Sequence, residues 1–227
     1  MLDILLLFFD DFFVSLLYET TIINMWSFNR LTDSSKIEKE DIIWNGPYSF
    51  PGFEEINGFD TIPDVEGVYL FTFKYKDGFL LYGAGITNST RTRILAHRRK
   101  YKTGNYTVLD VKSAENGLRK EIWHGWPKKK NKKIHQKEFR KRKETILKSV
   151  EKQLCAFRVF IAEVSDKRKR ARIEASIMQY IYNSKEHWSK LADRGMHLEA
   201  RYNYEMPIEA KNINSNKIFG LTEILEF

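Results

Sequence analysis

The 227-residue chain has room for one domain with additions, and its 42% hydrophobic and 14% aromatic residues suffice for a packed core, which excludes wholesale disorder. The net charge of +8 is concentrated, because residues 128–143 carry ten Lys or Arg against one acid, a net +9 that leaves −1 for the rest of the chain. Such concentration favours a polyanionic partner. The single cysteine, Cys155, excludes a disulfide framework and a cysteine-based zinc site, and favours a cytoplasmic protein.

The N-terminal segment, residues 1–26, is apolar but lacks the pattern of a membrane span. Asp10 and Asp11 interrupt it, and no run approaches the ~20 apolar residues that a span requires. We therefore expect no membrane partner. Two interpretations stay open: the segment is an amphipathic helix that docks on the core, or the native chain starts at Met25 and residues 1–24 contribute nothing. The second is favoured.

A β-hairpin is predicted next along the chain. Residues 67–74 (GVYLFTFK) are rich in the β-branched and aromatic residues typical of strands. The dipeptide Asp77-Gly78 is a strong hairpin turn signal, and residues 79–87 (FLLYGAGIT) form the expected return strand.

A helix is predicted directly after this hairpin, at residues 91–102. Residues 88–90 (Asn-Ser-Thr) offer N-caps, and Gly104 offers a stop. We expect Ile94 and Leu95 to face inward.

The following stretch, residues 105–153, is predicted to be a basic insertion. Residues 105–127 are expected to form a loop with aromatic anchors. Residues 131–152 are strongly charged with a thin apolar seam, which indicates an exposed helix. The basic run 128–143 is either a solvated helix or a surface for a phosphate backbone, where binding would weaken steeply with salt.

A third strand and a last helix complete the predicted core. Residues 154–164 (LCAFRVFIAEV) alternate with period two, and residues 168–183 form a helix with Ile173, Ile177, Tyr180 and Ile181 on its buried side. The order of hairpin, helix, insertion, strand and helix predicts an α+β fold, a small central sheet with helical and loop insertions. The core domain would span residues 67–183. Residues 27–66 and 184–227 would flank it as loops and short elements.

Five residues in this core could hydrolyse a phosphodiester. Tyr69 and Tyr82 lie on the two strands of the hairpin, which can bring them to one patch. Arg93 and His97 are spaced i, i+4 and share one face of the helix. Glu174 borders the buried stripe of the last helix, a reasonable place for a metal ligand. A cation held by a carboxylate activates water and neutralises charge, and an arginine can donate two hydrogen bonds to a phosphate.

These motifs resemble the core of the GIY-YIG nuclease superfamily. Residues 67–69 (GVY), residues 82–87 (YGAGIT), the pattern Arg93-Ile94-x-x-His97 and residues 172–175 (RIEA) follow the family's order, over less than a third of the chain.

The resemblance implies a role for each matching residue. Tyr69 would act on the attacking water as a base or positioning group, and its pKa would need lowering by the metal or by Arg93. Arg93 would hold the scissile phosphate. Glu174 would bind Mg²⁺ (or Mn²⁺), and His97 would assist Tyr69 or a phosphate oxygen.

The second motif departs from the family pattern. The spacing to Arg93 fits best if Gly83 takes the place of the family tyrosine, which would turn Tyr82 to the opposite face of the sheet. A bulge permitted by Gly83 would return Tyr82 to the site. For the asparagine that follows the last helix in the family, Asn183 and then Asn203 are the candidates.

The sequence therefore predicts a metal-dependent endonuclease, acting on double-stranded DNA in restriction, defence or repair. A dimeric protein is compatible with this prediction, because cleavage of a duplex needs two strand scissions. The alternative is a non-catalytic nucleic-acid-binding protein on a degenerate fold, and RNA stays open as the substrate. Taken singly, the tyrosines could be strand aromatics, and Glu174 could pair with Arg170.

Overall fold

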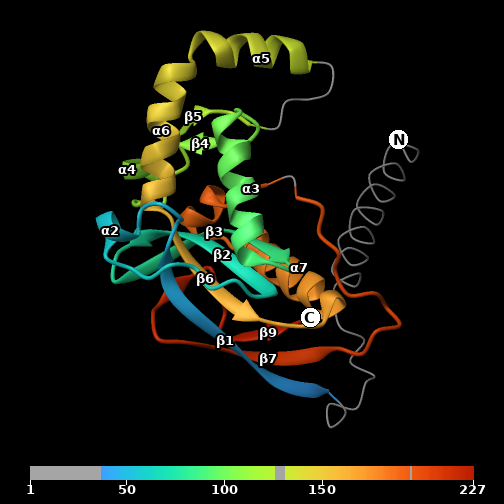
Figure 1. The fold of residues 1–227 in the computed structure, drawn as a ribbon. Helices are drawn as coiled ribbons and strands as arrows, with labels where there is room; N and C mark the ends of the chain where they lie inside the picture. Colours follow the sequence, from blue (N-terminus) through green and yellow to red (C-terminus); the bar gives the residue numbers. More distant parts are fainter. Residues whose placement is uncertain (1–36, 126–130, 195) are drawn as a thin grey trace, which may run out of the picture. The chain divides into compact units, whose positions relative to one another are not determined.

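The computed structural model describes residues 37–125, 131–194 and 196–227. Residues 38–227 form one compact unit of mixed α and β structure (Figure 1). The predicted N-terminal extension, residues 1–26, lies outside the described residues, as do residues 126–130 of the basic insertion. Among the described helices, none combines the length and apolar character needed to cross a membrane.

The predicted order of elements is present, with further strands on both sides of it. The strands are β1 (Glu38–Ser49), β2 (Gly67–Tyr75), β3 (Gly78–Thr87), β4 (Val108–Leu109), β5 (Glu121–Trp123), β6 (Arg158–Glu163), β7 (Ile208–Asn214), β8 (Ile218–Phe219) and β9 (Ile224–Glu226). The helices are α2 (Glu54–Asn57), α3 (Thr90–Lys102), α4 (Val111–Ala114), α5 (Lys132–Lys141), α6 (Lys143–Ala156), α7 (Lys167–Asn183) and the 3-10 helix η3 (His187–Leu191).

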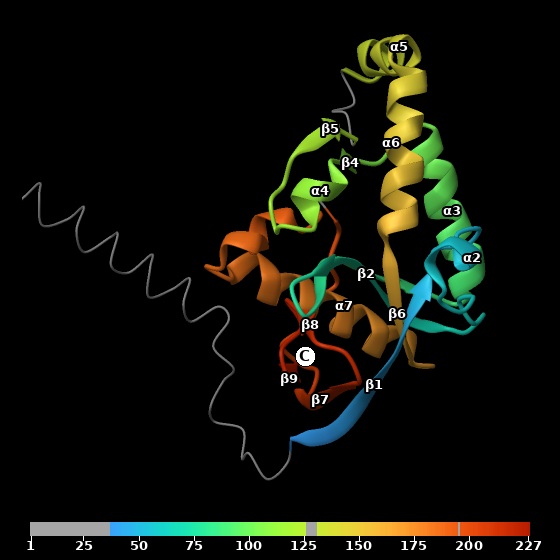
Figure 2. The same cartoon turned by 90° about the vertical axis from the view of Figure 1, so that its left-hand side faces the viewer.

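The main sheet curls around helix α7. Its strand order is β8-β3-β2-β6-β1-β7-β9, and α7 contacts β2 and β3 as well as β9 (Figure 2). Ile173, Ile177 and Ile181 are buried on α7, as the 3.6-residue period predicts. Tyr180, which was expected beside them, is 47% exposed, so that part of the prediction is wrong.

The sheet has seven strands in the described residues, and the expected small sheet is wrong in this respect. The flanks supply the difference, because β1 lies between β6 and β7 in the middle of the sheet. Ile42 and Trp44 of β1 are buried, and the Trp44 indole donates to Asn212 Oδ1 at 2.8 Å. β1 pairs in parallel with β7, far away in sequence, and no local pattern announces such a pairing.

The basic insertion also differs from its prediction. Its first part is not a plain loop, since β4 pairs with β5. The charged stretch forms two helices, α5 and α6, that meet at Arg142. Helix α6 continues through Ala156, so the third strand begins at Arg158 instead of Leu154. On α3, Leu95 is 39% exposed and does not face inward.

Candidate active site

The hydroxyl of Tyr69 is the centre of the site. It lies 2.6 Å from His97 Nε2, and Arg93 Nε donates to it at 3.2 Å. Gly85, opposite Tyr69 on β3, makes room for it, because a Cβ at Gly85 would stand 2.1 Å from the Tyr69 hydroxyl oxygen. Since Arg93 donates to this oxygen, the hydroxyl hydrogen of Tyr69 is free to point at His97.

Helix α3 holds the two partners of Tyr69 in place. Ser89 caps its N-terminus by accepting a hydrogen bond from Thr92 N–H at 3.2 Å. The side chain of Ile94 is fully buried and fixes which face of the helix looks inward. Arg93 and His97, one turn apart, then both reach Tyr69, as their spacing predicts.

Tyr82 is the extra residue of a β-bulge. The pairing of β2 with β3 shifts by one residue between Phe71 and Thr72, which leaves Tyr82 without a partner in the ladder. Its carbonyl accepts a hydrogen bond from Asp193 N–H at 2.8 Å instead. The sequence left open whether Tyr82 turns to the opposite face of the sheet or is returned to the site by a bulge. The structure has the bulge, and Tyr82 lines the same pocket as Tyr69. Burial raises the pKa of Tyr82 well above its usual value.

Glu174 faces this pocket from α7. It is 8% exposed, and within the described residues its carboxylate has no hydrogen bond or salt bridge. Arg170, the partner suggested by an i, i−4 pair, binds Glu66 at 2.9 Å. Burial raises the pKa of Glu174 to about 7, although the charge of Arg93 opposes the shift.

The five predicted site residues line one pocket of about 490 Å³. That volume can hold a hydrated cation together with a phosphate group. The arrangement can therefore place an arginine, a neutral base and a carboxylate around one phosphorus atom. The residues brought together are Tyr69, Tyr82, Arg93, His97 and Glu174.

Comparison of the chain with family models, curated proteins and solved structures gives no significant match. The arrangement of side chains in the pocket is therefore what bears on function.

Several pocket residues were missed by the sequence analysis. They are Tyr101, Tyr106, Asp193, His197 and Glu199. The last three come from an irregular segment after η3, where neither period-two nor 3.6-residue patterning marks them. The candidate asparagines, Asn183 and Asn203, are exposed and are absent from the pocket lining formed by the described residues, so the structure does not bring them to this pocket.

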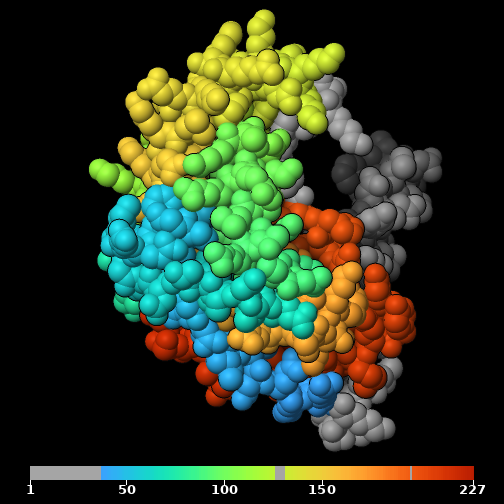
Figure 3. Space-filling view, viewed as in Figure 1, coloured from blue at the N-terminus to red at the C-terminus, as the bar shows by residue number. Residues whose placement is uncertain are grey.

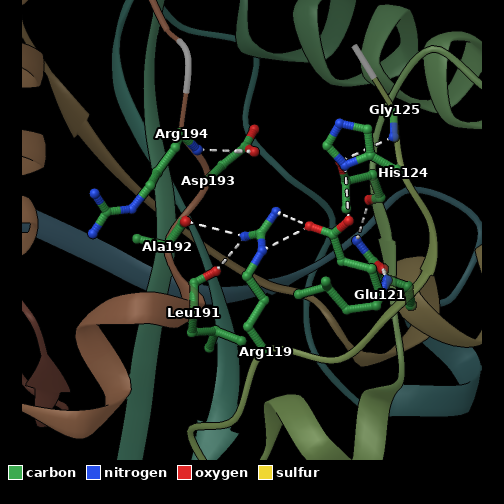
Figure 4. Close-up of polar contacts among 11 residues, drawn as sticks. Arg119, Glu121, His124, Gly125, Leu191, Ala192, Asp193 and Arg194 are labelled. Carbon is green, nitrogen blue, oxygen red and sulfur yellow. Dashed lines mark hydrogen bonds and ion pairs between the residues drawn. The ribbon is translucent and has the colours of Figure 1, made fainter. Parts of the chain in front are cut away.

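An arginine clamp fixes the segment that carries Asp193. Arg119 Nη1 donates to the carbonyls of Leu191 and Ala192 at 2.9 and 3.1 Å, as Figure 4 shows. Its other nitrogens hold Glu121, with Nε 2.8 Å from Oε1. The clamp ties β5 to the chain that enters the pocket, and thereby places Asp193 beside the bulge.

The protein alone does not lower the pKa of Tyr69. Burial raises it to about 12, which outweighs the lowering by Arg93. Burial, and then the charge of Arg93, lower the pKa of His97 to about 3. His97 is thus neutral at physiological pH and can accept the Tyr69 proton at Nε2.

The pocket suits a cation with few protein ligands. Mg²⁺ usually keeps several waters and takes one or two carboxylates. Glu174 offers a buried carboxylate without a protein partner in the described residues, and Glu199 lines the same pocket. No group of three or more His, Cys, Asp or Glu side chains within the described residues could hold a metal ion by itself.

Three of the cations that precede Glu174 on α7 are engaged within the protein. Arg168 pairs with Glu205 at 2.6 Å, and Lys169 pairs with Glu40 at 2.6 Å. Arg172 Nη2 donates to two backbone carbonyls. These side chains anchor α7 to its surroundings.

Proposed function

We propose that this protein is a Mg²⁺-dependent endonuclease of the GIY-YIG type that hydrolyses the phosphodiester bonds of double-stranded DNA. One observation carries the proposal. The Tyr69 hydroxyl is held between Arg93 and His97 in a pocket that is also lined by Glu174, a buried carboxylate without a hydrogen bond or salt bridge to any described residue. The family resemblance of the same residues supports it.

The proton of the attacking water would leave through Tyr69 and His97. As the water oxygen bonds to phosphorus, its proton passes to the Tyr69 oxygen while the Tyr69 proton passes to His97 Nε2 at 2.6 Å. His97 ends as an imidazolium, stabilised by the phosphate charge. The phosphorus–oxygen bond to the leaving group breaks, and the leaving oxygen takes a proton from solvent. This path needs no free tyrosinate, which the raised pKa of Tyr69 disfavours, but it depends on the phosphate charge to stabilise an imidazolium that the low pKa of His97 disfavours.

Arg93 would hold the scissile phosphate. Among the described residues its guanidinium uses only Nε for a hydrogen bond, to Tyr69, and its side chain is exposed. The two terminal nitrogens can therefore donate to two phosphate oxygens, and the same guanidinium orients Tyr69.

Glu174 would hold the cation. Bound Mg²⁺ would lower the pKa of its waters and neutralise charge on the phosphate. The carboxylate must be ionised to bind it, so protons compete with the metal below a pH of about 7.

A plasmid assay tests this function. Supercoiled DNA is incubated with the full chain and Mg²⁺, with EDTA, and with Glu174→Gln and Arg93→Lys variants. We expect nicking that EDTA abolishes and both variants reduce by at least roughly 100-fold. Binding without metal-dependent nicking would support the non-catalytic alternative. Nicking that persists in Glu174→Gln would place the chemistry elsewhere.

The ends of the products assign the kind of nuclease. We expect fixed ends if the protein acts in restriction, and scattered ends defined by the structure of the DNA if it acts in repair. A duplex cutter makes two scissions, so the assay is paired with measurement of the oligomeric state on the same duplex.

A further inference from the structure

Helix α5 carries free positive charge that the pocket does not use. Its sequence KKIHQKEFRK holds five cations and a single acid, Glu138. None of these side chains forms a salt bridge with a described residue. On α7, by contrast, Arg168, Lys169 and Arg170 each form a salt bridge within the protein.

One side of α5 is fixed to the rest of the molecule. Phe139 is buried against Trp123 and fills the space over Gly104, where a Cβ would stand 2.4 Å from its ring. The His135 ring lies 4.3 Å from that of Trp123, and its Nε2 lies 2.7 Å from the His124 carbonyl. These contacts orient α5, with His135 and Phe139 turned toward Trp123.

The opposite side of α5 presents a row of cations. Lys133, Lys137 and Arg140 are spaced by four and three residues, so they share one helix face, and all are exposed. At 100° per residue this face lies opposite His135 and Phe139. We call these three residues the outer stripe.

The outer stripe costs the helix stability. Lys133 and Lys137 are like charges at i, i+4, which destabilise a helix. Lys133 also lies in the first turn, where the positive end of the helix dipole disfavours a cation. A ten-residue helix is marginal by itself. A face of like charges that lowers the stability of its own helix is typical of a surface that meets an anionic partner.

Helix α3 leads from the pocket toward the helix that carries the stripe. It carries Arg93 near its N-terminus and runs toward α5 (Figure 1), and α3 and α5 share one face of the molecule (Figure 3). Exposed Arg99, Lys100 and Lys102 lie along its last turns.

We propose that the outer stripe of α5 binds the phosphate backbone of the DNA duplex whose scissile phosphate lies at Arg93. The inference rests on the proposed function and adds a second contact, outside the pocket. The occupant follows from charge complementarity, since a row of cations without salt bridges to described residues fits the regularly spaced phosphates of a duplex.

The test compares two triple variants of the full chain. The first neutralises the stripe by Lys133→Gln, Lys137→Gln and Arg140→Gln. The matched control removes three charges elsewhere, at Lys74, Lys112 and Lys185, which are exposed and have no salt bridge with described residues. Both are made in wild type and in Glu174→Gln, so that binding is measured without cutting.

Fluorescence anisotropy with a duplex of about 30 base pairs gives the affinity as a function of salt. We expect the stripe variant to bind roughly 10- to 100-fold more weakly at about 0.15 M salt, and to lower the slope of log K against log salt by about 2.7, while the control changes little. The melting temperature of the stripe variant should not fall, because its substitutions remove repulsion between like charges.

Equal losses in both triple variants would overturn the inference, since net charge alone would explain them. Unchanged binding by the stripe variant would overturn it as well. Both results leave the proposed function standing if the wild type still nicks plasmid. If no protein nicks but the stripe variant alone loses affinity, the stripe is a binding surface and the proposed function is wrong.

Discussion

The pocket and α5 can both meet a phosphate, the pocket with one arginine among buried groups and α5 with a row of exposed cations. In the pocket, burial shifts the pKa values of Tyr69, His97 and Glu174, and short hydrogen bonds fix Tyr69 to its partners. On α5 the cations lie exposed, without salt bridges to described residues. Electrostatic interactions in the buried pocket depend on the position of each group and are weakly screened by salt. The interactions of the exposed α5 cations depend instead on the number of charges and on the salt concentration.

This difference separates the expected effects of substitutions. A change in the pocket should act on kcat and hardly on binding, whereas a change on α5 should act on KM and its salt dependence.

The largest effect is expected for Glu174→Gln. Without the carboxylate the cation is lost, and single-turnover cleavage should fall by at least roughly 1000-fold while duplex binding is retained. Glu163→Gln, an exposed substitution on β6, is the control and should cut normally. If Glu174→Gln lost binding and cutting in parallel, Glu174 would not be separable from the binding surface.

The substitution Glu174→Gln should also stabilise the fold of the metal-free protein. The pKa of Glu174 in the folded protein, about 7, exceeds its ordinary value of 4.5, so ionisation of the buried carboxyl opposes folding fully above pH 7, and this penalty disappears below about pH 4.5. Glu174→Gln should therefore raise the free energy of unfolding by roughly 1 to 3 kcal/mol at about pH 8, measured by urea denaturation in EDTA. A lower stability would show that the carboxylate has a stabilising partner.

A smaller effect is expected for Gly85→Ala. The new Cβ would collide with the Tyr69 hydroxyl, so the ring must move away from His97 and kcat should fall roughly 100-fold. Gly83→Ala is a control on the same strand, since its Cβ would meet nothing closer than Asp193 Cβ at 3.8 Å. Equal kcat values for the two variants would exclude Tyr69 from the reaction.

Cleavage should depend on pH through Glu174. Below about pH 7, protonation competes with Mg²⁺, so the rate at limiting Mg²⁺ should rise about tenfold per pH unit and level off above that pH. Excess Mg²⁺ should move the bend to lower pH. A rate at limiting Mg²⁺ that is flat from pH 5 to about 8 would contradict the assigned metal ligand.

The smallest effect is expected for Tyr106→Phe. The Tyr106 ring centroid lies 5.3 Å from that of His97, so its hydroxyl borders the site but has no place in the proposed proton path. We expect a change in kcat of a few-fold at most. A loss of roughly 100-fold would make Tyr106 a member of that path and would require a different relay.

The local elements of the fold could be predicted because their signals are local. The strands of the hairpin and the cap of α3 are encoded within a few residues, and so is the i, i+4 pair of Arg93 and His97. The strand β1 could not be predicted, because its two partners, β6 and β7, lie more than 100 residues away.

The site itself was predictable in part. Tyr69, Arg93 and Glu174 could be placed from spacing, but the direction of Tyr82 depends on a bulge of one residue, which the sequence permits without requiring. Asp193 enters the pocket through the Arg119 clamp and a backbone hydrogen bond to Tyr82, contacts that no periodic pattern records.

Anomalous diffraction from crystals grown with Mn²⁺ and a short DNA duplex tests most directly whether the pocket is the catalytic centre. The account predicts a metal peak about 2 Å from a Glu174 carboxylate oxygen, with a backbone phosphate in contact with Arg93. A metal bound away from Glu174, or a phosphate held elsewhere in a protein that cuts DNA, would contradict it.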